Sequence, residues 1–117
     1  MRDYKELDVW QRAIKLVKNI YEIVEQFPKK ETYALSDQVR RSSVSIPSNI
    51  AEGFTRSSTK EFIHFLYIAL GSASELETQI IIAKEVGYMD NINNLIDDLA
   101  VIKKMINSLI SSLKRRL

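Results

Sequence analysis

The stretch STKEFIHFLYIALGSASELETQIIIAKEVG, residues 58–87, holds the longest helical pattern in the chain. Apolar side chains recur in it at three- and four-residue steps, which is the spacing of one face of an α-helix. Ser58 followed by Glu61 forms a capping box at its start, and Gly87 is placed for a left-handed C-terminal cap. The pattern predicts one helix over nearly the whole stretch.

The same amphipathic pattern occurs three more times. We therefore expect helices at about residues 8–27, 31 or 32 to 53 or 54, 58 or 59 to 86, and 91–114. Asp8 and Asp90 are the expected N-caps of the first and last helices, and Pro28 ends the first. Long helices joined by short loops predict a single all-α domain over residues 1–117, an antiparallel up-down-up-down four-helix bundle.

Pro47 lies in the middle of the second expected helix. Proline lacks a backbone N–H, and its ring clashes with the carbonyl one turn earlier. We expect the helix to bend near Pro47 or to split in two there. Ser42, Ser43 and Ser45 come just before the proline, where their side chains can hydrogen-bond to the backbone.

The composition excludes several classes of protein. The 117 residues include only 3 Gly and 2 Pro, too few for the turns of an all-β fold, and no Cys that could form disulfides or thiolate metal sites. His64 is the one histidine, so it forms a single Glu-x-x-His pair with Glu61, whereas a di-metal carboxylate bundle needs two. No Gly-rich phosphate loop or activated nucleophile is recognisable. We expect no enzyme activity, no metal and no cofactor.

The start of the chain is charged where a signal peptide would be apolar. No apolar run approaches the roughly 18 residues of a membrane span. We therefore expect a cytoplasmic protein that does not insert into a membrane.

The second and third helices carry more apolar surface than one bundle core needs. The additional positions are Val44, Ala51, Ile63, Leu70 and Ile81. A helix that is apolar over much of its circumference is buried on more than one side, and extra apolar surface on a small protein usually marks a partner surface. We predict self-association through these residues. The alternative is that they belong to a thick monomer core.

Polar side chains recur along the second helix and face matching groups on the third. The predicted network comprises Gln38, Ser45, Asn49, Glu52, Glu75 and Gln79. Gly71 and Ala73 are small enough to let the two backbones approach. Buried polar groups must be paired, so we interpret the network as fixing helix register, the alternative being a ligand or active site. Arg41 either joins it through Glu52 or lies on the surface.

The net charge of +2, from 17 Lys+Arg and 15 Asp+Glu, is too small to indicate a nucleic-acid partner by itself. The cations expected to contact phosphate are Arg40, Arg41, Arg56 and Lys60. Repetition of these cations in a closed oligomer would strengthen the positive field that attracts phosphates. The alternative is that they are ordinary solvated surface charges balanced by Glu and Asp. Lys29–Lys30 and Lys114–Arg116 could meet at another end of the bundle. No aromatic-rich stacking platform is apparent, so sequence-specific single-strand readout is not predicted.

The segment LSDQVRRSSVSIPSNIAEG, residues 35–53, resembles the signature of a family of small bacterial four-helix-bundle proteins. These proteins are often encoded in intervening sequences inside 23S ribosomal RNA genes and are sometimes labelled ribosomal proteins. The resemblance continues, in order and with matching spacing, at residues 7–11, 27–28, 60–66, 71–79 and 87–88. It implies the bundle architecture over nearly the whole chain and brings no catalytic residues.

That family is similar in architecture to the accessory proteins of diversity-generating retroelements. Those proteins form barrel-like pentamers of four-helix bundles, and they engage a reverse transcriptase and nucleic acid through positive surfaces. The resemblance therefore implies a homopentamer whose partners are RNA or DNA and a protein such as a reverse transcriptase. Together with the residues, it leads us to expect a non-enzymatic homo-oligomeric scaffold that binds nucleic acid, RNA above all. The alternative is a protein-interaction adaptor with no nucleic-acid binding.

Overall fold

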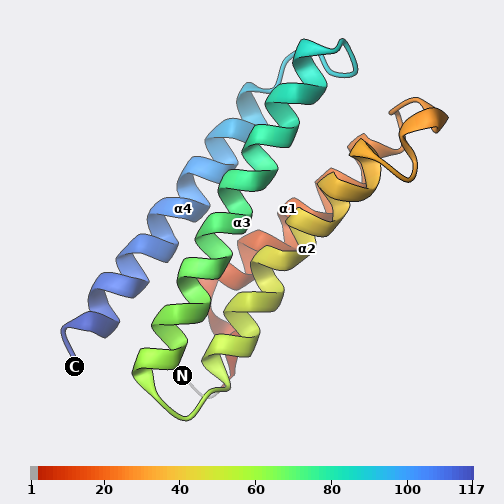
Figure 1. Ribbon diagram of the computed structural model, residues 1–117. Helices are drawn as coiled ribbons and strands as arrows, with labels where there is room; N and C mark the ends of the chain where they lie inside the picture. The colour runs from red at the N-terminus through yellow and green to blue at the C-terminus, as the bar shows by residue number, and fades with distance from the viewer. Residues whose placement is uncertain (1–2) are drawn as a thin grey trace.

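The computed structural model describes residues 3–117 (Figure 1). Its elements are the 3₁₀ turn η1 (Tyr4–Glu6), α1 (Asp8–Val24), the 3₁₀ turn η2 (Lys29–Glu31), α2 (Leu35–Phe54), α3 (Thr59–Glu85) and α4 (Asn93–Lys114). No strand occurs in this range, so the all-α prediction is confirmed. Met1 and Arg2, which begin the charged N-terminal segment, lie outside the described residues.

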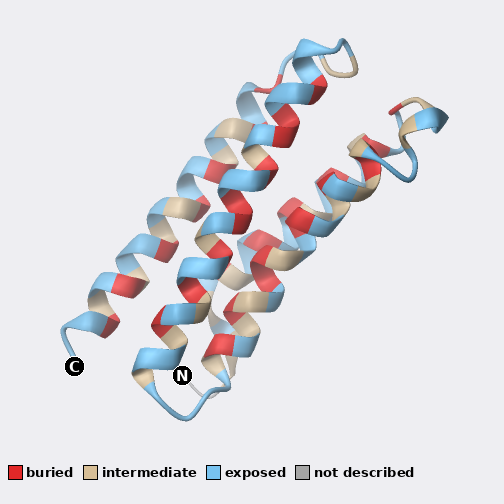
Figure 2. Cartoon of the chain, in the orientation of Figure 1, coloured by how far each residue is buried: buried red, intermediate tan, exposed pale blue. Residues whose placement is uncertain are grey.

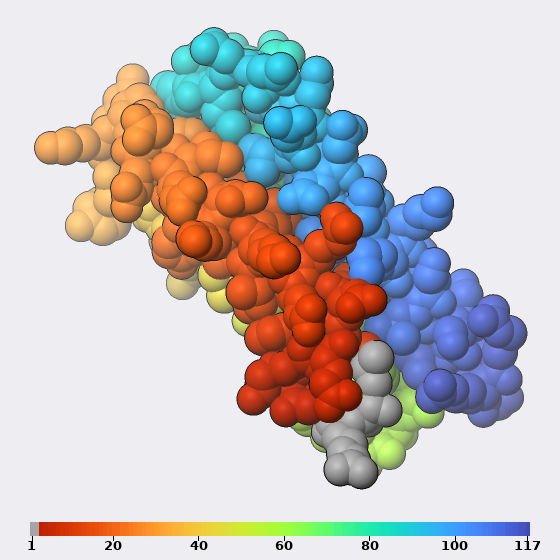
Figure 3. Space-filling model, turned by 180° about the vertical axis from the view of Figure 1, so that it is seen from behind, coloured from red at the N-terminus to blue at the C-terminus, as the bar shows by residue number. Residues whose placement is uncertain are grey.

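The helices alternate in direction and form two hairpins, α1 with α2 and α3 with α4 (Figure 1). Contact is most extensive between α2 and α3, whereas α1 and α4 meet over a smaller area. Seen from behind, α1 and α4 lie side by side (Figure 3), and Arg12 of α1 pairs with Asp98 of α4 at 3.6 Å. The molecule measures 46 × 23 × 20 Å. The predicted up-down-up-down bundle is confirmed.

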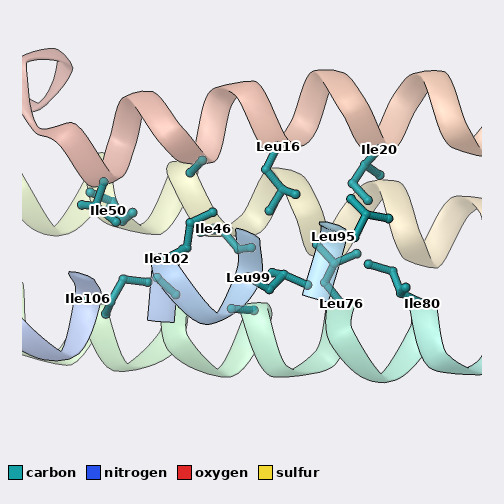
Figure 4. Packing of buried hydrophobic residues seen from close by; sticks show 14 of the residues in the cluster. Leu16, Ile20, Ile46, Ile50, Leu76, Ile80, Leu95, Leu99, Ile102 and Ile106 are labelled. Carbon is teal, nitrogen blue, oxygen red and sulfur yellow. The ribbon is translucent and has the colours of Figure 1, made fainter. Parts of the chain in front are cut away.

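Each helix turns one stripe of buried side chains toward the others, as the colouring of Figure 2 shows. The largest side chains with no more than 1% exposure are Leu16, Ile20, Val39, Ile46, Ile50, Leu66, Leu76, Ile80, Leu99, Ile102 and Ile106. Most of them meet in the middle of the bundle (Figure 4). Burial of each such side chain contributes about 1.5–3 kcal/mol to stability, so this shared core is what holds the four helices together. In residues 3–117 no helix is long and apolar enough to cross a membrane.

Pro47 does not divide α2, which continues through it as one helix, so a split is excluded. Pro47 offers no amide to the carbonyl of Ser43 one turn earlier. Nearby side chains donate to other backbone carbonyls of the same helix. Ser43 Oγ donates to the Arg40 carbonyl at 2.7 Å, and Asn49 Nδ2 donates to the Ser45 carbonyl at 2.8 Å. The predicted help from the serine-rich segment is therefore confirmed.

The predicted N-cap Ser58 and the left-handed Gly87 of α3 are confirmed, whereas the second bond of the predicted capping box, from the Ser58 amide to the Glu61 side chain, is absent from residues 3–117. Ser58 Oγ accepts a hydrogen bond from the Glu61 amide at 3.1 Å. At the other end Gly87 has a φ of +89°, and the Tyr88 amide donates to the Ala83 carbonyl at 2.8 Å. This is the six-to-one bond of a Schellman cap, which requires a left-handed residue that glycine adopts without strain.

The predicted N-cap of α1 is wrong, and the helix is shorter than expected. Asp8 is its first helical residue, preceded by Leu7, which makes no side-chain capping bond. The turn η1 runs directly into α1. The side-chain cap in this region belongs to η1, because Asp3 Oδ1 accepts from the Lys5 amide at 2.9 Å. At the other end α1 stops at Val24, before Phe27.

The starts of α2 and α4 also lie later than predicted. Lys29–Glu31 forms the separate turn η2, and α2 begins only at Leu35. Asp90 is not the N-cap of α4, because Asn91 Oδ1 takes the local amide, that of Asn93, at 2.9 Å. Short polar turns therefore replace the first turn that the periodicity assigned to each helix.

The close approach of α2 and α3 occurs at Gly53, not at Gly71 as predicted. A Cβ built on Gly53 would lie 2.6 Å from Phe65 Cβ and 3.0 Å from Phe62 Cδ1. At Gly71 a Cβ would meet nothing within 4 Å. Phe65 Cβ is attached to the backbone and cannot move aside on its own, so only glycine fits where the two helices converge.

We predict opposite effects of alanine at these two glycines. Gly53→Ala overpacks the contact and lowers the free energy of unfolding by about 1–3 kcal/mol. Gly71→Ala, the matched control, raises it by about 0.5–1 kcal/mol, because alanine is the better helix former on an open surface. Urea unfolding followed by circular dichroism at one fixed protein concentration measures both. Equal effects of the two variants would contradict the packing described for Gly53.

Candidate nucleic-acid interface

A line of hydrogen-bonded polar side chains joins α2 to α3. Ser42 Oγ donates to Gln79 Oε1 at 2.6 Å, and the hydroxyls of Ser45 and Ser72 lie 2.8 Å apart. Asn49 Nδ2 adds a bond to Ser45 Oγ at 2.9 Å. We call these five residues the polar seam. Ser42, Ser72 and Gln79 are buried, so the two bonds that cross between the helices, Ser42–Gln79 and Ser45–Ser72, satisfy groups withdrawn from water and favour one register.

The seam contains half of the predicted network. Ser45, Asn49 and Gln79 belong to it. Ser42 and Ser72 were missed as members, although each lies at helical spacing from a predicted one: Ser42 is three residues from Ser45, and Ser72 is seven residues from Gln79. That spacing was the available signal.

The other three predicted members lie outside the seam. Gln38 and Glu75 are exposed at the edge of a surface concavity of about 560 Å³, which Ser42 and Ser45 also line. Glu52 Oε1 lies 3.8 Å from Arg56 Nη2 one turn later on the outside of the bundle. These side chains point away from the α2–α3 contact because the buried arc of α2 is already filled by the seam and the core.

Arg41 is a surface residue. Its guanidinium pairs with Asp37 Oδ2 at 3.6 Å, and 78% of its side chain is exposed. Arg41 therefore does not join a buried network with Glu52. An exposed pair of this kind contributes little to stability, so Arg41 can exchange Asp37 for a phosphate oxygen at small cost.

The four predicted phosphate contacts do not form one patch. Arg40 and Arg56 are separated by 16 positions of the chain, which is about 24 Å along a helix at 1.5 Å per residue. Arg40 and Arg41 lie toward the α1–α2 connection, whereas Arg56 and Lys60 lie at the α2–α3 connection (Figure 1). Each subunit therefore offers two separate pairs of cations.

Three of the four cations already have partners in the fold, of which the Arg41–Asp37 pair leaves most of the Arg41 side chain exposed. Arg40 Nη2 donates to the Thr32 carbonyl at 3.1 Å. The Arg56 guanidinium lies 4.8 Å from the centre of the Phe65 ring as well as near Glu52. Lys60, in the first turn of α3, is exposed. Arg41 and Lys60 are thus the two predicted contacts that a phosphate backbone reaches most easily.

Lys29–Lys30 and Lys114–Arg116 lie at opposite ends of the bundle, which contradicts the idea that they meet (Figure 1). The first pair belongs to the α1–α2 connection and the second cluster follows α4, so an antiparallel bundle separates them by its length. Lys114 Nζ instead donates to the Tyr67 hydroxyl at 2.8 Å.

The predicted interface residues differ in exposure. Val44, 37% exposed, and the half-buried Ala51 line an apolar groove of about 280 Å³ between α1 and α2. The other groove residues are Tyr4, Trp10, Ile14, Val17, Pro47 and Ser48. On α3, Ile81 is 45% exposed and Leu70 is half-buried against the core.

Ile63 is not an outer surface residue, contrary to the prediction. It is 7% exposed and belongs to the hydrophobic core. The reason is that α3 is flanked by α2 on one side and α4 on the other, so it buries a wider arc than a helix with one neighbour. For this residue the thick-core alternative is correct.

Glu61 and His64 do not form a metal site in the described residues. Both are exposed, and His64 packs edge-on against the Phe65 ring at 5.7 Å. Residues 3–117 contain no group of three or more carboxylate or imidazole side chains placed to hold a metal ion.

Two side-chain contacts that the sequence analysis missed, one ion pair and one hydrogen bond to a carboxylate, tie distant segments together. Lys103 Nζ donates to Glu77 Oε1 at 2.6 Å between α4 and α3, in a half-buried position. Tyr88 Oη donates to Glu31 Oε2 at 2.7 Å and thereby links the two connections at one end of the bundle. Neither pair is close in sequence, so helical periodicity carried no signal for them.

The bond from Tyr88 lowers the pKa of the Glu31 carboxyl below its ordinary value, and the Leu35 amide, which donates to Glu31 at 3.3 Å, lowers it further. The same bond to Glu31 raises the pKa of the Tyr88 hydroxyl. Because the folded pKa of Glu31 is depressed, its stabilisation is present above the unfolded pKa and is lost as the pH falls through the folded value. For Tyr88 the sign is opposite, and stabilisation is lost at strongly alkaline pH.

We therefore predict that Tyr88→Phe melts at a lower temperature than the wild type at pH 7, because Glu31 loses its phenolic donor. The difference shrinks as the pH falls through the depressed pKa of Glu31 in the wild type, because the protonated carboxyl no longer needs the phenolic donor. Thermal melts followed by circular dichroism across this range test the link. A melting difference that stays constant with pH would contradict the link to the Glu31 charge, because the ring packing on Phe27, 5.7 Å away, is the same in both proteins.

Comparison with known proteins agrees with this architecture. The family model described as 23S rRNA-intervening sequence protein matches residues 5–108. The fold is similar to the crystal structure of a protein with unknown function from the S23 ribosomal protein family of Bacteroides thetaiotaomicron VPI-5482, with a TM-score of 0.81 and 26% identity over 87% of this chain and 97% of that chain. No curated protein matches the chain. The resemblance found in the sequence is confirmed, and the chain belongs to the 23S rRNA-intervening sequence protein family.

Proposed function

We propose that the protein is a non-enzymatic homo-oligomeric scaffold that binds nucleic acid, RNA in particular, through basic patches repeated from subunit to subunit. The observation that carries the proposal is the apolar groove between α1 and α2. Helix α2, which forms one wall of this groove, also carries the exposed Arg41. One surface is suited to other copies of the chain, and the other to phosphates. The family name, which refers to 23S rRNA, supports RNA as the nucleic acid.

Exposed apolar side chains support self-association. Large apolar side chains that are at least 37% exposed lie on α1, α2 and α3. They include Val44, Ile81, Ile14, Tyr21, Ile68 and Ile82. Apolar residues exposed in contiguous groups usually mark an interaction site. The groove and the outer face of α3 lie on different parts of the subunit, so contact of one with the other is heterologous and closes into a ring when the rotation permits. A pentamer is the ring size that the resemblance implies.

Repetition supports nucleic-acid binding. A single subunit carries only +2, but a closed ring repeats Arg41 and Lys60 once per subunit. Regularly spaced cations attract a phosphate backbone and gain affinity by releasing its counterions. The gain depends on the number of contacts, so a weak patch on one subunit becomes significant in the assembly.

We predict that Val44→Glu dissociates the oligomer. The change places a charge in an apolar contact, where an unpaired carboxylate is costly. Val101→Glu is the matched control, because Val101 is 39% exposed on α4 and lies outside the groove. Sedimentation velocity at micromolar concentration is expected to show an oligomer for the wild type and Val101→Glu, and a folded monomer for Val44→Glu. A monomeric wild type would contradict the proposal of a homo-oligomeric scaffold.

We predict that the double variant Arg41→Glu, Lys60→Glu weakens RNA binding by tenfold or more and reduces the slope of log K against log salt by about 0.7–0.9 per lost phosphate contact. Fluorescence anisotropy with 23S rRNA fragments and with random RNA, at two salt concentrations, measures both. The control is Lys15→Glu, Lys18→Glu, which makes the same change in net charge on α1. Equal losses for the two double variants would show that only overall charge matters.

The groove also favours a second function, that of a protein-interaction adaptor without nucleic acid. Its aromatic lining, where the Tyr4 and Trp10 rings lie 5.5 Å apart, is suited to an apolar helix of another protein, of which a reverse transcriptase is the example that the resemblance implies. An oligomer that binds no RNA at low salt is the outcome that favours the adaptor.

A further inference from the structure

We propose that the tip of the α1–α2 connection is a binding site for single-stranded RNA, in which Tyr33 stacks on an unpaired base while Lys29 and Lys30 contact the flanking phosphates. The inference rests on the proposed nucleic-acid function and assigns it a surface and a strand type. It adds a base-stacking residue to the phosphate contacts, at a place distant from Arg56 and Lys60.

Tyr33 is 95% exposed, more than any other large apolar side chain in residues 3–117. Three of the other four tyrosines have partners in the fold, and the fourth, Tyr21, is only 46% exposed. Tyr4 packs on Trp10, Tyr67 accepts from Lys114, and Tyr88 donates to Glu31. Among the described residues no hydrogen bond or ring contact joins Tyr33 to the rest of the protein. Its ring therefore offers both faces to a ligand and adds nothing to the core.

The tip is held in a defined shape. The turn η2 is closed by hydrogen bonds from the Glu31 amide to the Pro28 carbonyl at 2.9 Å and from the Thr32 amide to the Lys29 carbonyl at 3.1 Å. Arg40 of α2 then donates to the Thr32 carbonyl at 3.1 Å, directly before Tyr33. A ring presented on an ordered turn loses less entropy on binding than a ring on a flexible loop.

The tip is positively charged because its two lysines outnumber its one acid, Glu31. Lys29 and Lys30 are exposed. Glu31 accepts hydrogen bonds from Tyr88 Oη at 2.7 Å and from the Leu35 amide at 3.3 Å, which hold its carboxylate against the bundle. The outer surface of the turn thus presents two ammonium groups and one aromatic face.

This combination matches a single strand and not a duplex. Single-stranded nucleic acids are bound by cations that follow the backbone and by aromatic rings on which unpaired bases stack. In an RNA duplex the base faces are covered by their neighbours, and only phosphates and hydroxyls are accessible. A duplex therefore uses the lysines alone, whereas a single strand uses the lysines and Tyr33.

The test measures binding of the full-length protein to a 12-nucleotide single-stranded oligoadenylate and to a 12-base-pair RNA duplex by fluorescence anisotropy. Tyr33→Ala is expected to weaken single-strand binding about tenfold and to leave duplex binding unchanged. Tyr33→Phe keeps the ring and is expected to bind as the wild type does. Tyr67→Ala, the control, removes a half-exposed tyrosine from α3 and is expected to have no effect. Circular dichroism verifies that each variant is folded.

The outcomes separate the two proposals. If the wild type binds neither RNA, both the nucleic-acid function and the tip site are overturned. If the wild type binds RNA and Tyr33→Ala binds the single strand equally well, the tip site alone is overturned. An equal loss for single strand and duplex also overturns stacking, because it assigns the effect to the phosphate contacts.

Discussion

The contact between α2 and α3 is the constraint on which the rest of the structure depends. It is the most extensive helix–helix contact in the bundle, and it joins the two hairpins. At Gly53 the helices come so close that a single added carbon would lie 2.6 Å from Phe65 Cβ. Further along, the seam bonds from Ser42 to Gln79 and from Ser45 to Ser72 require the same alignment. Steric fit and hydrogen bonding thus select one register together.

This contact also decides which surfaces of α2 remain free. One side of the helix is occupied by α3 and the core, so Val44 and Ala51 lie toward α1, where they line the apolar groove. Arg41 is left on the solvent side with Asp37. The proposed partner surface and the proposed phosphate-binding cation therefore occur on one helix because its buried arc is already filled.

The antiparallel arrangement distributes the remaining cations between the two ends of the bundle. Lys29 and Lys30 lie with the α1–α2 connection, and Arg56 and Lys60 with the α2–α3 connection (Figure 1). The bond between Glu31 and Tyr88 ties the two connections at the first end. In the proposed assembly, a strand of RNA that followed one subunit from end to end would pass both basic regions, and repetition around a ring would extend this path.

The sequence by itself determined the features that depend on neighbours along the chain. Apolar periodicity located the helices, and the Ser58 cap and the left-handed Gly87 followed from residues a few positions apart, because such bonds close within one turn. Asp90 failed as a cap because Asn91 took the amide of Asn93, and Asp8 failed because it is itself the first helical residue of α1.

Only the tertiary structure decided which helix lies against each face. The pattern of α3 did not reveal that α2 and α4 both cover it, and so Ile63 was assigned to the surface although it is in the core. For the same reason Gly71 was chosen over Gly53, and the full exposure of Tyr33 was not foreseen. A helical repeat records how much of a helix is buried, but the partner that buries it is set by packing between segments distant in the sequence.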